Sequence, residues 1–248
     1  KKILAFDWLD DEDKTPEFYY FQPELQQYDD SFSTEKLDEN FNEKRKIGEN
    51  DSYICELIRN DSIIDFIQYI HKSNYDLNGE IRESVFETNP FLIEKNTTMI
   101  EYAAFFGSIQ IVQYLLNNDV RTNHRLLDYA IHSNNPELIN LISDHYPFSY
   151  VSFETAIKCH HNSVANYVKN QIYTSLIQQK NCLKYHNFEF IDENIQFDTI
   201  LFTLCEYDYY IIVENILKTK DIDVNVIETF TKDDHNYSEV ETNILILF

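Results

Sequence analysis

The chain has 248 residues, of which 43% are hydrophobic, and this is enough apolar material for a folded core. Its 20 basic and 43 acidic residues give a formal net charge of -23, which repels phosphate backbones and anionic membrane surfaces. We therefore expect neither nucleic acid nor a membrane as a partner. The charge favours other proteins with basic surfaces, although a role in simple solubility explains it equally well.

The turn-forming residues are scarce, with only three glycines and five prolines. A sandwich or barrel of many short strands needs more of them, so we predict an all-α fold. Four cysteines, without a C-x-x-C pair, lie in apolar helical patterns, which is typical of buried thiols in a reducing compartment. No apolar run approaches the roughly 18 residues that a membrane span needs. We expect a cytoplasmic protein, with the cytoskeleton or a cilium as a narrower location.

Residues 1–48 differ in composition from the rest of the chain. An acidic run at Asp10–Asp13 is followed by the aromatic cluster Phe18–Phe21 and by a charged stretch that ends at Lys46. No helical apolar stripe longer than about two turns is present. We predict an acidic, aromatic N-terminal arm that is extended or partly helical. Its rings either cover the end of the following segment or anchor a partner, and the sequence favours neither.

Residues 49–248 contain an internal repeat. The segment Tyr102–Leu115 aligns without a gap with Tyr129–Ile142 and then with Thr155–Val168. Further copies are Thr203–Leu217 and, more loosely, Glu56–Ile70. Together these predict about five units, and Thr242–Ile246 resembles the opening of a sixth. The missing initiator Met and the apolar end of the sequence lead us to expect a segment of a longer protein.

Each unit has the pattern of a short helix, a tight turn and a second helix. The turn residues are types that tolerate left-handed backbone at a helix end, and they are Asn60–Asp61, Gly107, Asn134–Asn135, His160–His161 and Asp208. In one second helix, Ile111, Val112, Leu115 and Leu116 form a single apolar stripe. One unit cannot bury this stripe alone, so we predict a solenoid of stacked units. The small residues Ala103, Ala104, Ala130 and Ala156 let first helices approach closely.

The segment Thr98–Leu115 resembles an ankyrin repeat of the T-P-L-H-x-A-A-x-x-G-x-x-x-V-V-x-x-L-L type. Together with Leu127–His132 and Ala156–Asn162, it is similar to a large, poorly characterised ankyrin-repeat family of protists. Asp221–Asn225 resembles the turn between ankyrin repeats. The resemblance implies an ankyrin-like solenoid of stacked helix-turn-helix repeats over residues 49–248.

The repeats are shorter than the usual ankyrin unit of about 33 residues. We therefore predict that the hairpins between repeats are clipped to simple loops around 117–123 and 144–149. The stretches 73–96 and 171–198 are longer than a loop, and each is predicted to hold an irregular repeat or an extra helix. Tyr173–Ile177 is one candidate for that helix.

The resemblance also implies where binding occurs, because the last two positions of each first helix face the groove of an ankyrin array. Carried over position by position, the expected partner-binding residues are Arg59, Asn60, Phe105, Phe106, His132, Ser133, Lys158, Cys159, Glu206 and Tyr207. Phe105 and Phe106 are the natural anchor, since aromatic side chains dominate interface energetics. The alternative is that these two rings pack beneath the preceding irregular segment.

A search for catalytic and metal-binding motifs finds none. A calcium loop requires Gly at its sixth position and Glu at its twelfth. The loop that starts at Asp11 has neither residue at these positions, and the loop that starts at Asp221 also has neither. Cys159, His160 and His161 are consecutive and diverge around a helix end, so they do not predict a metal site. Three glycines cannot supply a nucleotide-binding loop. We predict no enzyme, no metal and no cofactor.

Two functions remain compatible with these patterns. The first is a non-catalytic scaffold or adaptor that binds other proteins through ankyrin repeats. The second is a structural component of a large cytoskeletal assembly, such as a ciliary or axonemal microtubule lattice. Neither the periodicity nor the charge separates the two.

Overall fold

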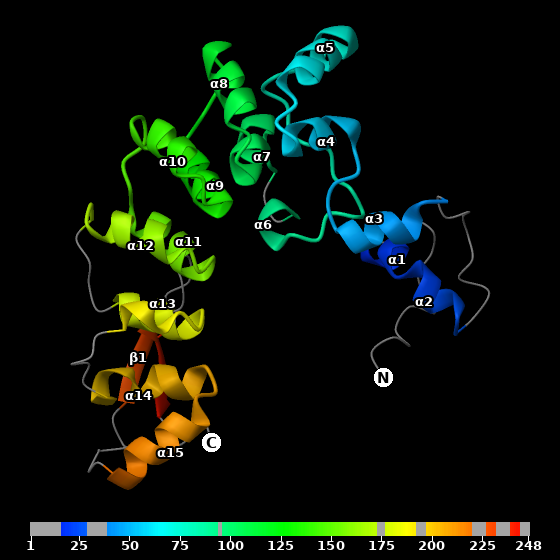
Figure 1. The fold of residues 1–248 in the computed structure, drawn as a ribbon. Coiled ribbons are helices and arrows are strands. Elements are labelled where there is room, and N and C mark those ends of the chain that lie inside the picture. The colour runs from blue at the N-terminus through cyan, green and yellow to red at the C-terminus, as the bar shows by residue number, and fades with distance from the viewer. Residues whose placement is uncertain are drawn as a thin grey trace. The chain divides into compact units, whose positions relative to one another are not determined.

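The computed structural model describes residues 16–28, 39–93, 96–172, 177–191, 197–219, 227–231 and 239–243. The chain forms two compact units, Lys1–Tyr146 and Pro147–Phe248. Apart from one isolated bridge and one pair of strands, the regular structure of the described residues is helical, which confirms the predicted helical fold (Figure 1). None of the helices in these ranges has the length and apolar character needed to cross a bilayer.

The first unit contains ten described helices. In chain order they are α1 (Pro16–Tyr20), α2 (Gln22–Gln26), α3 (Phe41–Ile47), α4 (Tyr53–Arg59), α5 (Ile63–Ser73), α6 (Pro90–Ile93), α7 (Met99–Phe106), α8 (Ile109–Asn117), α9 (Arg125–Ser133) and α10 (Pro136–Ser143). The second unit contains α11 (Tyr150–Lys158), α12 (Asn162–Lys169), α13 (Ile177–Lys184), the short 3-10 helix η4 (Phe188–Phe190), α14 (Phe197–Glu206), α15 (Tyr210–Thr219), β1 (Ile227–Thr231) and β2 (Glu239–Asn243).

Five helix pairs coincide with the five repeats predicted from the sequence, and each pair has the predicted turn between its two helices. The residue that ends the turn has a left-handed backbone with φ between 46° and 75°, at Asp61, Gly107, Asn134, His160 and Asp208. In the second pair, the backbone N–H of Ser108 donates to the carbonyl of Ala103 at 2.9 Å, which closes α7 before α8 begins. The turn positions predicted from Gly, Asn, Asp and His are therefore confirmed.

A sixth pair, α13 with η4, lies in the stretch 171–198. His186 has φ of 54° and ends α13 in the same way as the other turns. Its second helix is only the three residues Phe188–Phe190, which explains why the repeat pattern does not reveal it. Of the candidate helix Tyr173–Ile177, only Ile177 is described, as the first residue of α13. The stretch 73–96 holds the four-residue α6 and no helix pair among its described residues.

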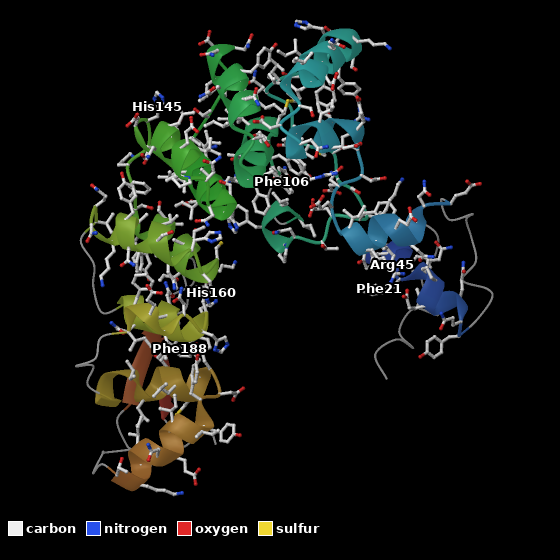
Figure 2. The ribbon with its side chains drawn as sticks, in the orientation of Figure 1. Phe21, Arg45, Phe106, His145, His160 and Phe188 are labelled. Atoms are coloured by element: carbon white, nitrogen blue, oxygen red, sulfur yellow. The ribbon has the colours of Figure 1, made fainter. Side chains whose placement is uncertain are left out.

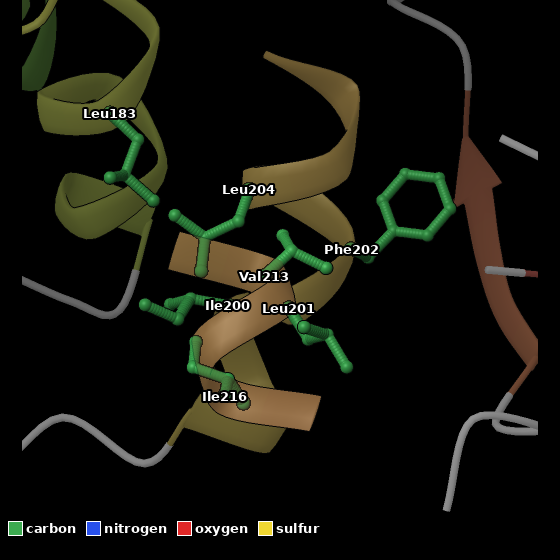
Figure 3. Packing of buried hydrophobic residues seen from close by; sticks show 7 residues of the cluster. All are labelled: Leu183, Ile200, Leu201, Phe202, Leu204, Val213 and Ile216. Carbon is green, nitrogen blue, oxygen red and sulfur yellow. The ribbon is translucent and has the colours of Figure 1, made fainter. Parts of the chain in front are cut away.

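First helices lie side by side within each unit, α4 with α7 and α9 in the first, and α11 with α13 and α14 in the second. The small residues Ala103, Ala104, Ala130 and Ala156 have no exposed surface, as predicted for close helix contacts. Figure 3 shows how Leu183 of α13 joins Leu204 of α14 and Val213 of α15 in one apolar cluster of the second unit. The core of each unit is therefore formed between neighbouring helix pairs.

Side-chain hydrogen bonds fix the register of neighbouring pairs. In three of the turns, the side chain of the residue that follows the left-handed residue donates a hydrogen bond to a carbonyl near the end of the preceding first helix. Ser108 Oγ donates to Ile58 O at 2.5 Å, Asn187 Nδ2 to Ile157 O at 3.1 Å and Tyr209 Oη to Leu183 O at 2.8 Å. Each of these helix-end carbonyls also accepts the backbone N–H of its own turn residue, at Asp61, His160 and His186, so the side chain adds a second bond that links two pairs.

Replacing Ser108 by alanine is expected to lower the free energy of unfolding by about 0.5–1.5 kcal/mol, because the buried hydrogen bond between the two pairs is lost while Ile58 O keeps the backbone N–H of Asp61 as a donor. Urea denaturation followed by circular dichroism measures this loss. Ser143→Ala is the matched control, since Ser143 Oγ donates to Asn140 O on an exposed face of its own helix. Equal denaturation midpoints for the two variants would show that the bond between pairs does not stabilise the unit.

The end of the second unit corrects the sequence prediction. Strands β1 and β2 pair antiparallel, with Ile227 opposite Asn243 and Thr231 opposite Glu239. Thr242 and Asn243 lie in β2, so the predicted helical opening of a sixth unit at Thr242 is wrong there. The alternation of Thr and Val with Glu along this segment favours a strand over a helix. Ile244–Ile246 and the predicted turn Asp221–Asn225 lie outside the described residues.

The helices before α4 pack within the first unit. The Phe41 ring of α3 lies 5.3 Å from the ring of Phe86 and packs against it edge to face. Lys44 forms an ion pair with Asp51 at 3.0 Å. In the aromatic cluster, Phe18 is buried whereas Phe21 is half exposed. The connections α8–α9 and α10–α11 contain no strand, as the prediction of clipped loops requires.

Candidate protein-binding surface

Three first helices of the first unit end beside one another, and their last residues form a row. Arg59 ends α4, Phe106 ends α7, and His132 is the next-to-last residue of α9. The rings of Phe105 and Phe106 are 5.1 Å apart, and the Phe105 ring is 5.0 Å from that of His132. The Arg59 guanidinium lies 5.9 Å from the Phe106 ring. All four side chains keep some exposed surface. We call this set the aromatic row.

The position of Arg59 in the row is fixed by several contacts. Its guanidinium donates to Asn50 O at 2.7 Å and to Tyr102 Oη at 2.8 Å, and it forms an ion pair with Glu49 at 2.8 Å. Because Glu49 neutralises its charge, the Arg59 guanidinium above the Phe106 ring is not a free cation. The row is therefore an apolar and aromatic surface, with its one guanidinium already paired.

Phe91 of α6 is a member of this surface that the repeat pattern does not reveal. Its ring stacks on Phe105 at 6.1 Å with an interplanar angle of 21°, and it lies 4.1 Å from the His132 ring. Phe105 thus packs against the irregular segment that precedes α7. Phe106 instead contacts the ring of Tyr102 at 4.8 Å, and Figure 2 labels its position at the end of α7. We include Phe91 in the aromatic row from here on.

The polar residues predicted at the same helix ends take part in the turns. Ser133 Oγ donates to Ala130 O at 2.7 Å and accepts from the backbone N–H of Asn135 at 3.2 Å. Asn60 is exposed and follows α4 as its C-cap residue, and its backbone N–H donates to Glu56 O at 3.1 Å. Ser133 therefore shapes the turn, whereas the side chain of Asn60 is open to solvent beside Arg59.

In the second unit, the predicted partner-binding residues lie in two groups, one at the end of α11 and one at the end of α14. Lys158 ends α11 and is followed by the half-buried Cys159, whereas Glu206 ends α14 and is followed by the half-buried Tyr207. These groups are not neighbours in the row of first helices, because α13 lies between α11 and α14.

The end of α13 fills that gap with Lys184 and Tyr185, which the sequence prediction missed. Tyr185 Oη donates to Glu154 Oε1 at 2.9 Å, and Lys180 pairs with Glu206 at 3.1 Å, so α13 is linked to both neighbours. The signal that could have revealed this helix end is His186, which has the same residue type as the left-handed turn residue His160.

Burial raises the pKa values of two side chains at these helix ends. Burial raises the pKa of the Cys159 thiol to about 11, so this thiol stays protonated and unreactive at neutral pH. Burial likewise raises the pKa of Tyr207. In the described ranges, no three His, Cys, Asp or Glu side chains gather closely enough to hold a metal ion.

Comparison with known proteins gives one family match. Residues 118–193 match the model of a family described as "Domain of unknown function (DUF3447)". This range starts just after α8 and extends through η4, so it includes His132, Ser133, Lys158 and Cys159. No curated protein and no solved structure matches the chain.

Proposed function

We propose that this chain is an ankyrin-type repeat protein that acts as a non-catalytic scaffold or adaptor for other proteins. The recurrence of the same helix pair along the chain supports the ankyrin assignment. Buried small residues on first helices, left-handed turns and short connections return in successive pairs. Stacked pairs of this kind contact mainly their neighbours, and their helix ends present an extended surface for binding.

The observation that carries the binding role is the aromatic row. It brings Phe105, Phe106 and His132 from two neighbouring helix pairs into ring contact while leaving them partly exposed. Aromatic side chains with a restricted position are effective anchors at interfaces, since little conformational entropy is lost when a partner binds. The net charge of -23 favours partners with basic surfaces by electrostatic steering. A cytoplasmic location is part of this proposal.

Replacing Phe106 by alanine is expected to weaken partner binding by about 10- to 100-fold, because a central aromatic anchor contributes a few kcal/mol. The proteins retained by the tagged full chain are first identified by cross-linking and quantitative mass spectrometry. The dissociation constant of one purified partner is then measured for each variant. Purified microtubules are included as a separate probe, and sedimentation of the chain with them would identify the partner as a cytoskeletal lattice.

The matched control is Ile64→Ala on α5, which also removes an apolar side chain from the first unit. Ile64 is 70% exposed and lies on a second helix, outside the aromatic row. The control is expected to bind like the unmodified chain. A Phe105→Ala, Phe106→Ala double variant that remains folded and keeps its partner affinity would reject the aromatic row as the binding surface.

A further inference from the structure

A cavity of about 530 Å³ adjoins the aromatic row in the first unit. Tyr102 connects the two, because it lines the cavity and its ring lies 4.8 Å from that of Phe106. The other walls include Phe21, most residues of the segment 81–88 and the end of α6. Phe21 is labelled in Figure 2 and is half exposed, so the cavity has accessible walls. The volume is within the range of cavities that hold ligands.

The cavity walls combine apolar side chains with a carboxylate. Ile81, Val85 and Leu92 supply apolar surface, and the half-buried Glu87 supplies the charge. One Glu87 oxygen accepts from the backbone N–H of Asn50 at 3.3 Å, and the other accepts from that of Asn89 at 3.0 Å. These bonds fix the carboxylate in place, and both of their donors are neutral backbone groups.

Two neighbouring carboxylates differ from that of Glu87 because each forms an ion pair. Asp51 is paired with Lys44 at 3.0 Å, and Glu49 is paired with Arg59 at 2.8 Å. Among the described residues, no ion pair includes Glu87. Burial raises the pKa of Glu87, and the charge of Glu49 adds to this, whereas the two backbone N–H groups and the charge of Arg59 lower it only in part. A cation supplied from outside would remove this cost.

We propose that the cavity is a subsite for one Lys or Arg side chain of a bound polypeptide, with Glu87 accepting hydrogen bonds from its charged group. The methylene stem would lie along Ile81 and Val85, as long basic side chains commonly bury their stems and keep the charge paired. Glu83, exposed at the same cavity, adds a second negative charge, which disfavours an anionic ligand despite the exposed Arg82 nearby. This inference rests on the proposed function, because it names the chemistry that the protein-binding surface selects.

The test uses Nα-acetyl-L-lysine amide as a probe of the full chain. Two-dimensional NMR is expected to show saturable shifts of backbone amides in residues 81–88 and at Tyr102, with a dissociation constant on the order of 1 mM. Nα-acetyl-L-norleucine amide has a similar apolar chain without the ammonium group and is expected to cause no saturable shift. Glu87→Gln removes the charge and is expected to weaken binding of the lysine probe at least about tenfold.

Two further variants keep the test decisive. Glu137→Gln removes an exposed carboxylate of α10 that does not line the cavity, and it is expected to bind the probe normally. Val85→Lys places an ammonium group inside the cavity, so it is expected to block the probe even if Glu87→Gln fails to fold. Equal shifts with the norleucine probe would overturn the proposal, as would undiminished lysine binding by folded Glu87→Gln or Val85→Lys.

These outcomes are separable from a failure of the protein-binding proposal. Phe106 does not line the cavity, so its variants test the aromatic row without changing the subsite. If the lysine probe still binds but no variant of the aromatic row changes partner affinity, only the aromatic row is rejected as a binding surface. Loss of partner affinity in Phe106→Ala, without any specific lysine binding, would reject the subsite alone.

Discussion

Replacing Ala130 by glutamate is expected to lower the free energy of unfolding of the first unit by about 4 kcal/mol or more, which is enough to unfold many domains of this size. Ala130 lies on α9, next to α7, and has no exposed surface. A glutamate there needs space that the close helix contact does not have, and its charge would be buried without a partner. Thermal and urea denaturation followed by circular dichroism measure the loss.

The control for this variant is Asn140→Glu, which introduces the same side chain on the exposed face of α10. Its denaturation midpoint is expected to stay close to that of the unmodified chain, because exposed substitutions of this kind change stability by about 0.5 kcal/mol or less. An unchanged midpoint in Ala130→Glu would contradict the close packing of first helices and, with it, the proposed ankyrin-type arrangement.

Replacing Phe153 by alanine is expected to cost about 3–5 kcal/mol in the second unit. Phe153 of α11 has no exposed surface, and its ring packs edge to face on Phe190 of η4 at 5.7 Å. The substitution leaves a cavity between α11 and the pair that the repeat pattern does not reveal. Denaturation monitored by NMR resonances of residues 150–169 and 179–190 follows the second unit directly.

Tyr167→Ala is the control, because it also removes an aromatic ring from the second unit but from a side chain that is 44% exposed. We expect it to cost less than about 1 kcal/mol. If Phe153→Ala is no more destabilising than Tyr167→Ala, then η4 does not act as a packed part of the unit, and α13 with η4 is not a structural equivalent of the other pairs.

Neighbouring side chains hold the aromatic row in position, so binding is expected to depend on them. Phe105 is held by Phe91, and Arg59 is held by Glu49 and Tyr102, so the surface is positioned before any partner arrives. Interfaces built on side chains that are already ordered lose less entropy on association. Variants that loosen α6 should therefore weaken binding even though α6 is not one of the repeated helices.

The sequence determined the local features of this fold. Left-handed turns were predictable at Gly107, Asn134 and His160 because the residue types that tolerate this backbone, and the helical patterns around them, are local information. The same holds for the burial of Ala103 and Ala130, since a small residue that recurs at one position of a helix marks a close contact. Helix ends that carry Arg59, Phe105, Phe106 and His132 were located for the same reason.

Only the tertiary structure decided which residues from irregular segments join these helix ends. Phe91 enters the aromatic row, and Glu87 reaches the cavity, from a stretch whose sequence has no repeat to align. The η4 helix of the sixth pair is too short to produce a periodic pattern, and the strand at Thr242 depends on pairing with β1. Contacts between segments distant in sequence depend on how the chain packs, and a local pattern of residue types does not encode them.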